Sequence, residues 1–208
     1  MNDDLRAQLD TGCAELQLHL ADQQKQQLLT YLALLHKWNK VYNLTSVRDP
    51  QLMLTRHILD SLSLYPYIDC NSLLDVGSGA GLPGIPLAIS FPHMAVTLLD
   101  SNIKKTRFLQ QVKAELTLNN VTVVHGRVEQ LDLPKFEAVT ARAFATIAEI
   151  IDLAGRHCDD AGTMLLMKGV YPEQELAEIG DGFTVKDIVA LSVPGEQAER
   201  HLVRLIKD

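Results

Sequence analysis

The sequence is poor in the residues that build disulfide frameworks and zinc sites. Its 208 residues include three cysteines, far apart and odd in number, with no C-x-x-C pair. The seven histidines form no H-x-H or H-E-x-x-H pattern. We therefore expect no disulfide framework, no metal site and a reduced, cytoplasmic setting.

Long apolar runs and a basic N-terminal segment are also missing. No apolar run reaches the length of a membrane-spanning helix, and the chain begins with the acidic, polar M-N-D-D-L-R. We therefore expect no membrane segment and no signal or transit peptide. The content of 47% hydrophobic and 22% charged residues is ordinary for a globular protein. This length allows one well-packed domain with an extension.

The net charge of −7 argues mildly against nucleic-acid binding, but the charges are unevenly placed. Residues 151–208 carry 11 acidic and 6 basic side chains, whereas residues 31–60 carry four basic and two acidic ones. Residues 101–113 carry four basic side chains and no acidic one. Such patches are compatible with RNA binding, although solvated helix faces explain the charges alone more simply.

Residues 1–66 are predicted to be helical. Apolar residues at three- and four-residue spacing from Leu28 to Tyr42 predict an amphipathic helix, with Asp22 as its N-cap. A second helix is predicted to begin at Asp49-Pro50. We interpret residues 1–66 as a helical cap on a domain formed by residues 67–208.

Strands and helices alternate from Ser72 onward, which is typical of parallel βαβ units. The last two predicted strands are joined by Pro194-Gly195-Glu196, which favours a hairpin turn. The sequence therefore predicts an α/β, Rossmann-like sheet that is mostly parallel and ends in an antiparallel hairpin. The predicted strands are 73–76, 96–99, 121–124, 138–141, 163–167, 185–193 and 202–206, and the predicted helices after Ser72 are 85–91, 103–116 and 147–157.

A glycine-rich stretch from Ser72 to Pro86 follows the pattern strand, loop, helix. Asp75 lies in the strand, and Gly77, Gly79 and Gly81 then occupy every second position. Glycine permits positive φ and lets a ligand approach backbone N–H groups. Tight turns use glycine too, but this combination of strand, loop and helix is typical of a nucleotide-type binding site.

The spacing narrows the choice of ligand. Leu82 stands where the dinucleotide fingerprint needs its third glycine, and Ile85-Pro86 stands where a P-loop needs Lys and Ser or Thr. Asp100 ends the next predicted strand, where a ribose hydroxyl needs an acceptor. A ligand with a ribose but no phosphate, such as S-adenosylmethionine, therefore fits better than NAD or ATP.

Four motifs occur in order along the chain. They read L-H-K-W-N-K-V-Y-N-L-T-S-V-R-D at 35–49, R-H-I-L-D-S-L at 56–62, D-V-G-S-G-A-G-L-P-G-I-P-L at 75–87 and A-R-A-F-A at 141–145. With them the chain, from about Leu28 to its C-terminus, resembles the RsmG (GidB) family of bacterial methyltransferases.

The resemblance implies a class I S-adenosylmethionine-dependent fold and methylation of a guanine N7 in 16S ribosomal RNA. The product of the cofactor would be S-adenosylhomocysteine. The implied partner is the small ribosomal subunit or its assembly intermediate, with no DNA and no membrane, and we expect a monomer.

A cofactor site follows from the resemblance and the loop together. The resemblance places Gly77 and Leu82 at the methionine and ribose, Val128 and Glu129 near the adenine, and Arg142 at the cofactor or target. We add to this predicted cofactor site Gly79, Gly81 and Asp100, because of the loop geometry and the ribose acceptor described above. Without the family, Val128-Glu129 would be interpreted as an ordinary loop entering a short helix.

Methylation of guanine N7 needs no general base, because N7 carries an unprotonated lone pair at neutral pH. Catalysis then depends on in-line positioning and on charge. The absence of an Asp/Asn-Pro-Pro-Tyr motif and of a Pro-Cys pair agrees with this. The candidates for handling the target are Asn43, His57, Arg127, Arg142 and Lys168.

The three cationic candidates follow the third, fourth and fifth predicted strands, and ligands gather at the carboxyl ends of parallel strands. The alternative is that they form salt bridges with Asp75, Glu129 or Asp60. A lone helical histidine such as His57 is more often a packing or surface residue.

Other interpretations stay open at this point. Trp38 and Tyr42 are candidates for base stacking, but their spacing favours core packing. A methyltransferase of the same fold with a small-molecule or protein substrate is the main rival function. A dinucleotide-dependent reductase and a non-catalytic nucleotide-binding or ribosome-assembly protein are more distant alternatives.

Overall fold

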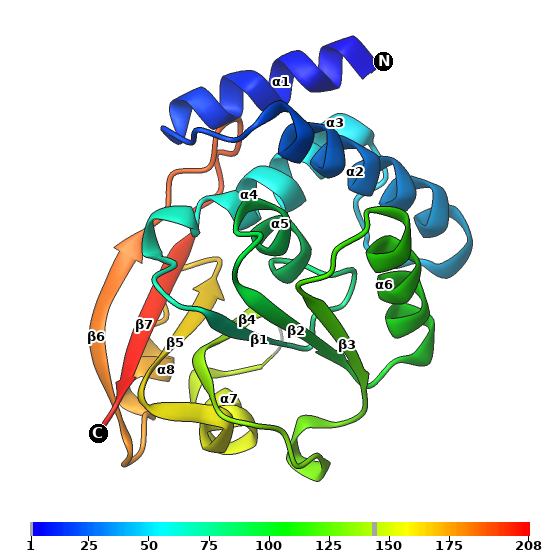
Figure 1. The fold of residues 1–208 in the computed structure, drawn as a ribbon. Helices are drawn as coiled ribbons and strands as arrows, with labels where there is room; N and C mark the ends of the chain where they lie inside the picture. The colour runs from blue at the N-terminus through cyan, green and yellow to red at the C-terminus, as the bar shows by residue number, and fades with distance from the viewer. Residues whose placement is uncertain (1, 143–144) are drawn as a thin grey trace.

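A seven-stranded sheet forms the centre of the protein in the computed structural model, which describes residues 2–142 and 145–208. Its strand order is β3-β2-β1-β4-β5-β7-β6 (Figure 1). The first five strands are parallel, and β7 lies antiparallel between β5 and β6. The strands are β1 (Ser72–Val76), β2 (Ala95–Asp100), β3 (Val121–His125), β4 (Phe136–Arg142), β5 (Cys158–Lys168), β6 (Phe183–Ala190) and β7 (His201–Lys207).

Helices cover both faces of this sheet (Figure 1). The α-helices are α1 (Asn2–Glu15), α2 (Asp22–Tyr42), α3 (Pro50–Met53), α4 (Asp60–Leu62), α5 (Gly84–Ser90), α6 (Ile103–Glu115), α7 (Ile147–Ala154) and α8 (Glu173–Ala177). A π-helical segment, η1 (Leu54–Leu59), joins α3 to α4 without a break, and short 3-10 turns occur at η2 (Tyr65–Tyr67), η3 (Val128–Gln130) and η4 (Gly155–His157).

The predicted fold class is confirmed, including the mostly parallel sheet and its closing antiparallel hairpin. Every predicted strand is present, with ends that differ by at most five residues. Helix α5 begins and ends one residue before its predicted bounds, α6 ends one residue early, and two further helix ends differ from the prediction. Ala21, rather than Asp22, is the N-cap of α2, and α7 gives way to a 3-10 turn at Gly155. Asp49 caps α3 as expected, because its carboxylate accepts from the N–H groups of Gln51 and Leu52.

Strand β1 is buried on both faces because it lies inside a parallel sheet. Successive side chains of a strand point to opposite faces. Leu73 accordingly packs in the core beneath α2, α5 and α6, whereas Leu74 and Val76 pack in the core beneath α7.

The N-terminal helices share the first of these cores. Leu28, Tyr31, Leu32 and Leu35 form the buried face of α2, as their spacing predicted, and lie in the same apolar cluster as Leu73. We retain as a proposal that residues 1–66 are a helical cap on residues 67–208. None of the helices in the described part of the chain combines the length and apolarity needed to span a bilayer.

Gly84 permits close packing between the first turn of α5 and the sheet. A Cβ at this position would lie 2.2 Å from Cδ2 of Leu98 and 2.6 Å from Oδ2 of Asp75. Real Cβ atoms do not approach other atoms so closely, so the neighbours would have to shift. The hydrogen bond from the Gly84 N–H to Asp75 Oδ2, 2.9 Å long, lies at the same point.

We predict that Gly84→Ala lowers the free energy of unfolding by about 1–3 kcal/mol, the usual cost of overpacking. This loss exceeds the gain of about 0.5–1 kcal/mol that Ala offers in a helix. The net loss of stability appears as a lower midpoint in urea denaturation. Gly180→Ala is the control, because no atom of the described residues lies within 4 Å of a Cβ built there. Equal midpoints for the two variants would contradict the close packing.

Candidate active site

A cavity of about 860 Å³ opens at the carboxyl ends of the parallel strands. This is the edge at which ligands bind in open α/β sheets, and the volume suits a small-molecule site. Its wall is formed by residues 76–80 and 82 after β1, 99–101 after β2, 126–129 after β3, Arg142 of β4 and 167–169 of β5, with Leu44, Thr45, Asp60, Lys105, Leu153 and Arg200.

The glycine loop forms one wall. Gly77 and Gly79 line the cavity with φ angles of 66° and 59°, so both need the conformational freedom of glycine. Leu82 lines the cavity as well, but Gly81 does not belong to its lining. A Cβ on Gly81 would lie 2.5 Å from Ile85, so this glycine permits packing of the loop against α5.

Asp100 faces this loop from the end of β2 and is only 5% exposed. Its Oδ2 accepts a hydrogen bond of 2.9 Å from the Gly79 N–H, and its Oδ1 accepts one of 2.8 Å from the Asn102 N–H. Lys105 Nζ lies 3.5 Å from Oδ2. A carboxylate has about four lone-pair sites, so acceptor capacity remains for a ligand hydroxyl.

Asp75 lies behind the loop and is not part of the cavity wall. Its side chain is fully buried, and burial raises the pKa of Asp75 to about 7. Oδ2 binds the Gly84 N–H, whereas Oδ1 has no hydrogen-bond partner within the described residues. Asp75 therefore shapes the loop from inside the core.

The turn after β3 supplies the wall next to Asp100. Val128 is buried, and Glu129 faces the cavity beside Arg127. Arg127 Nη1 lies 3.8 Å from Glu129 Oε1, and the Arg127 side chain is 68% exposed. The salt bridge considered as an alternative is therefore long and solvent-accessible, which makes it weak.

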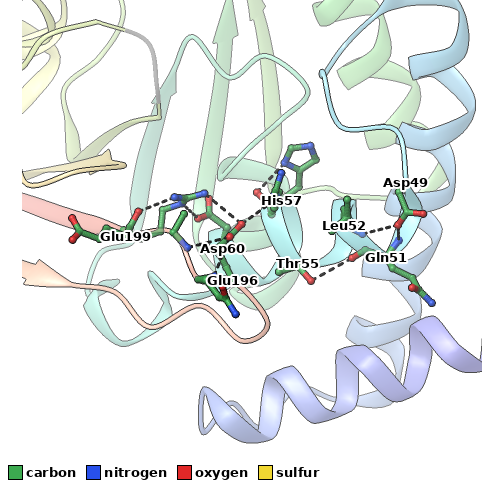
Figure 2. Close-up of polar contacts among 12 residues, drawn as sticks. Asp49, Gln51, Leu52, Thr55, His57, Asp60, Glu196 and Glu199 are labelled. Atoms are coloured by element: carbon green, nitrogen blue, oxygen red, sulfur yellow. Dashed lines mark hydrogen bonds and ion pairs between the residues drawn. The ribbon is translucent and has the colours of Figure 1, made fainter.

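Arg142 forms a salt bridge with a buried acid on the opposite wall. Its Nη1 lies 2.9 Å from Asp60 Oδ2, and Arg200 Nε lies 2.8 Å from the other oxygen of the same carboxylate. Glu196 extends the cluster, because its Oε2 lies 2.9 Å from Arg56 Nε. Figure 2 shows Asp60 and Glu196 side by side where the connection before β7 meets the helix that contains His57.

Lys168 at the end of β5 also has an acidic partner. Its Nζ lies 2.7 Å from Glu175 Oε2 and donates to the carbonyl oxygen of Ala145 at 2.8 Å. The three cationic candidates, Arg127, Arg142 and Lys168, thus line one cavity as predicted from their positions after successive strands. Two of the five residues of the 141–145 motif, Ala143 and Phe144, lie outside the described residues.

His57 is brought close to the cavity but does not line it. It is buried, its Nδ1 lies 2.9 Å from the Arg56 carbonyl oxygen, and its Nε2 lies 2.8 Å from Thr45 Oγ1. A carbonyl only accepts, so Nδ1 carries the proton and Nε2 accepts from the Thr45 hydroxyl. Burial and the charge of Arg142 lower the pKa of His57 to about 4, so the ring is neutral at neutral pH.

Asn43 likewise acts on the wall through its neighbours. It follows α2 in the left-handed conformation, with φ of 50°, and its side-chain oxygen accepts a 2.8 Å hydrogen bond from Arg48. The next two residues, Leu44 and Thr45, line the cavity. Asn43 and His57 therefore hold the loop that forms this part of the wall.

Sequence reasoning did not propose several of the lining residues for the site, among them three with polar side chains. Thr45 and Asp60 lie within motifs 35–49 and 56–62, so a signal for them existed, although Asp60 was considered only as a salt-bridge partner. Arg200 carries no motif signal, and only the fold brings it to the cavity. The interpretation of Trp38 as a core residue agrees with the 5.5 Å between the centroids of its ring and the ring of Phe108. The same interpretation is wrong for Tyr42, which is 43% exposed.

The described residues contain no group of three or more His, Cys, Asp or Glu side chains that could hold a metal ion. The cavity lining instead combines hydrogen-bond acceptors, such as the carboxylate of Asp100, with guanidinium and ammonium groups that lie beside them. It can bind a polar small molecule and an anionic substrate at the same time.

We predict that Asp60→Asn lowers the free energy of unfolding by about 3–5 kcal/mol, because it leaves two guanidinium groups without their buried partner. Asp160→Asn is a matched control. Asp160 also binds two cations, Lys135 and Lys207, but its side chain is 79% exposed. We expect no measurable change in its urea midpoint, since exposed ion pairs contribute little. Equal losses in both variants would contradict the buried network.

Comparison with protein families gives a match to the model described as rRNA small subunit methyltransferase G (GidB) over residues 24–203. The ribosomal RNA small subunit methyltransferase G of Marinobacter nauticus is 51% identical over 198 residues, which cover 94% of this chain and 92% of that protein. Its counterpart in Pseudomonas entomophila is 52% identical over 202 residues, which cover 95% and 93%.

Solved structures of lower identity share the fold. A SAM dependent methyltransferase from Aquifex aeolicus matches with a TM-score of 0.59 and 17% identity, covering 82% of this chain and 97% of its own. TYW2 of M. jannaschii in complex with AdoMet matches with a TM-score of 0.55 and 15% identity, covering 73% and 76%. The sheet order and the family match agree, and the chain belongs to the GidB family, the rRNA small subunit methyltransferases G.

Proposed function

We propose that this protein transfers the methyl group of S-adenosylmethionine to N7 of a guanine in 16S ribosomal RNA, leaving S-adenosylhomocysteine. The observation that carries the proposal is the family match over residues 24–203, joined to a cavity at the carboxyl edge of the sheet. The small ribosomal subunit or its assembly intermediate is the proposed partner. We further propose that the enzyme acts as a monomer in the cytoplasm, where that RNA is found.

The residues of the cavity fit S-adenosylmethionine. Asp100 retains acceptor capacity for ribose hydroxyls, and Gly77 and Gly79 let the ligand approach the backbone. Val128 and Glu129 lie beside Asp100 around the same cavity, at the place proposed for the adenine. Bound there, the cofactor would supply an electrophilic methyl group on a positively charged sulfur.

Methyl transfer to N7 requires the protein mainly to align N7 with the methyl group. N7 uses its own lone pair to form the new bond to the methyl carbon, the bond from carbon to sulfur breaks, and its electron pair returns to sulfur. The positive charge moves from sulfur to the guanine ring, and no proton is transferred. The cavity must therefore hold N7 in line and keep water out, which is catalysis by proximity and electrostatics.

The charges around the cavity favour an anionic substrate. Five cationic and three anionic side chains line it, in a chain with a net charge of −7. Arg142 binds Asp60 and the Arg56 carbonyl oxygen through Nη1 alone. Arg200 uses its three nitrogens for Asp60, the Glu199 carbonyl oxygen and Glu196. An arginine has five N–H donors. The remaining donors are available for RNA phosphate or for the O6 acceptor edge of guanine.

The proposal is tested by incubating the protein with labelled S-adenosylmethionine and small ribosomal subunits from a strain that lacks the enzyme. We expect label at N7 of one guanine in 16S ribosomal RNA. Calorimetry with S-adenosylmethionine alone, run in parallel, shows that the protein binds the cofactor. Bound cofactor without label in the RNA would exclude the proposed substrate, and label in a protein or small-molecule fraction would favour the rival methyltransferase.

We predict that Asp100→Ala weakens S-adenosylmethionine binding by one or two charge-assisted hydrogen bonds, each worth about 1.5–3 kcal/mol. Calorimetry measures the change in Kd. Asp100→Asn keeps the shape of the side chain but removes one acceptor oxygen, so an intermediate loss is expected. Asp132→Ala serves as the control, because Asp132 is exposed and does not line the cavity. An unchanged Kd in Asp100→Ala would remove this residue from the binding site.

A further inference from the structure

Two large apolar side chains are exposed just beyond the rim of the cavity. Val170 is 72% exposed and Tyr171 is 52% exposed. They follow Lys168 and Gly169, which line the cavity, but are not themselves part of the lining. Val170 alone separates Gly169 from Tyr171, so the Cα atoms of these two residues lie at most about 7.6 Å apart.

The ring of Tyr171 is held in place by the start of β7. It contacts the ring of His201 at a centroid distance of 5.6 Å and an interplanar angle of 87°. His201 Nδ1 lies 3.3 Å from the carbonyl oxygen of Gly169, and His201 pairs with Lys168 in the sheet register. Tyr171 therefore follows the cavity residue Lys168 by three positions, and His201 directly follows the cavity residue Arg200.

An edge-to-face contact with His201 leaves at least one face of the tyrosine ring uncovered by that histidine. If the edge of His201 meets the face of Tyr171, the opposite face of Tyr171 is uncovered by His201. If the edge of Tyr171 meets the histidine, both of its faces are uncovered by His201. In both cases a flat aromatic surface is offered to a planar group, which agrees with the exposure of more than half of the residue.

The excess of cationic side chains around the cavity indicates which kind of molecule stacks on the Tyr171 ring. Lys168 and Arg200 belong to the five cationic side chains that line the cavity, against three anionic ones. Single-stranded RNA offers both phosphates for the cations and unstacked bases for the ring. Aromatic side chains beside a cationic groove are the usual platform for such bases.

We propose that Tyr171 is a stacking platform for the nucleotide base that flanks the target guanine, an inference that rests on the proposed RNA methyltransferase function. The target guanine must lie inside the cavity, within reach of the methyl donor. A base on Tyr171 lies outside the cavity wall and therefore belongs to a neighbouring nucleotide. Holding that neighbour away from the RNA stack would present the guanine to the cavity.

The test compares Tyr171→Ala, Tyr171→Phe and Ile206→Ala. Ile206 is 40% exposed but pairs with Thr163 in the middle of β5, five positions before the cavity residue Lys168. Equilibrium binding of unmethylated small subunits is measured without turnover, together with kcat/KM for methyl transfer. We expect Tyr171→Ala to weaken both by about 5- to 150-fold, with Tyr171→Phe and Ile206→Ala within about twofold of wild type. The Kd for S-adenosylmethionine should stay within about twofold in all three variants.

The outcomes separate this inference from the proposed function. Wild-type protein that binds subunits but transfers no methyl group would contradict the proposed function, while the binding arm still decides the role of Tyr171. Equal binding by Tyr171→Ala and Ile206→Ala, or an equal loss in Tyr171→Phe and Tyr171→Ala, would overturn the stacking role. A loss of cofactor affinity that matches the loss of subunit affinity would overturn it as well.

A photoreactive 4-azidophenylalanine at position 171 identifies the contact directly. We expect a crosslink to a 16S ribosomal RNA nucleotide next to the methylated guanine. A crosslink to a ribosomal protein, or to RNA remote from that guanine, would show that the exposed ring serves a different contact.

Discussion

The hydrogen bond between the Gly84 N–H and the buried carboxylate of Asp75 is the constraint on which the site depends. It joins the interior of β1 to the first turn of α5, and the glycine loop is the segment that closes between them. Ser78 adds two further links, because its hydroxyl donates to the Asp75 carbonyl and accepts from the Leu99 N–H. The loop is thus fixed by the core of the sheet before any ligand arrives, so little ordering cost remains for binding.

An acid at such a position carries an energetic cost. Full burial disfavours the charged form of Asp75, which is why its pKa rises to about 7. The compact loop is retained in spite of this cost. Aspartate is usually found on the surface of a protein. The burial of Asp75 therefore indicates that β1 belongs to a functional site.

The sequence predicted the parts of the fold that depend on local order. Strand and helix periodicity identified β1 to β7 and α5 to α7, and glycine spacing located the loop, because these features follow from neighbouring residues. The placement of Arg127, Arg142 and Lys168 around one cavity also followed, since the carboxyl ends of parallel strands meet at one edge.

The rest of the site depends on contacts between distant residues, and no local pattern encodes them. Asp60 binds Arg142 across 82 positions and Arg200 across 140 positions. Nothing near Arg200 distinguishes it from a surface arginine, and the buried carboxylate that holds it lies in another part of the fold. The contacts of His57 with Thr45 and a backbone carbonyl oxygen were likewise not visible in the sequence, and its role in handling the target stays a prediction.

The position of β7 in the sheet determines how the fold responds to loss of its C-terminal residues, and when the sheet is completed during synthesis. β7 is the last strand in sequence, yet it lies between β5 and β6 and contributes Leu202, Val203 and Leu205 to the buried core. Losing residues 201–208 would therefore open the sheet in its interior and not at an edge. During synthesis the N-terminal part of a chain emerges first, so the sheet stays incomplete and Arg200 stays apart from Asp60 until residues 200–207 have been made. A chain that has not reached Arg200 thus lacks one of the residues that line the cavity.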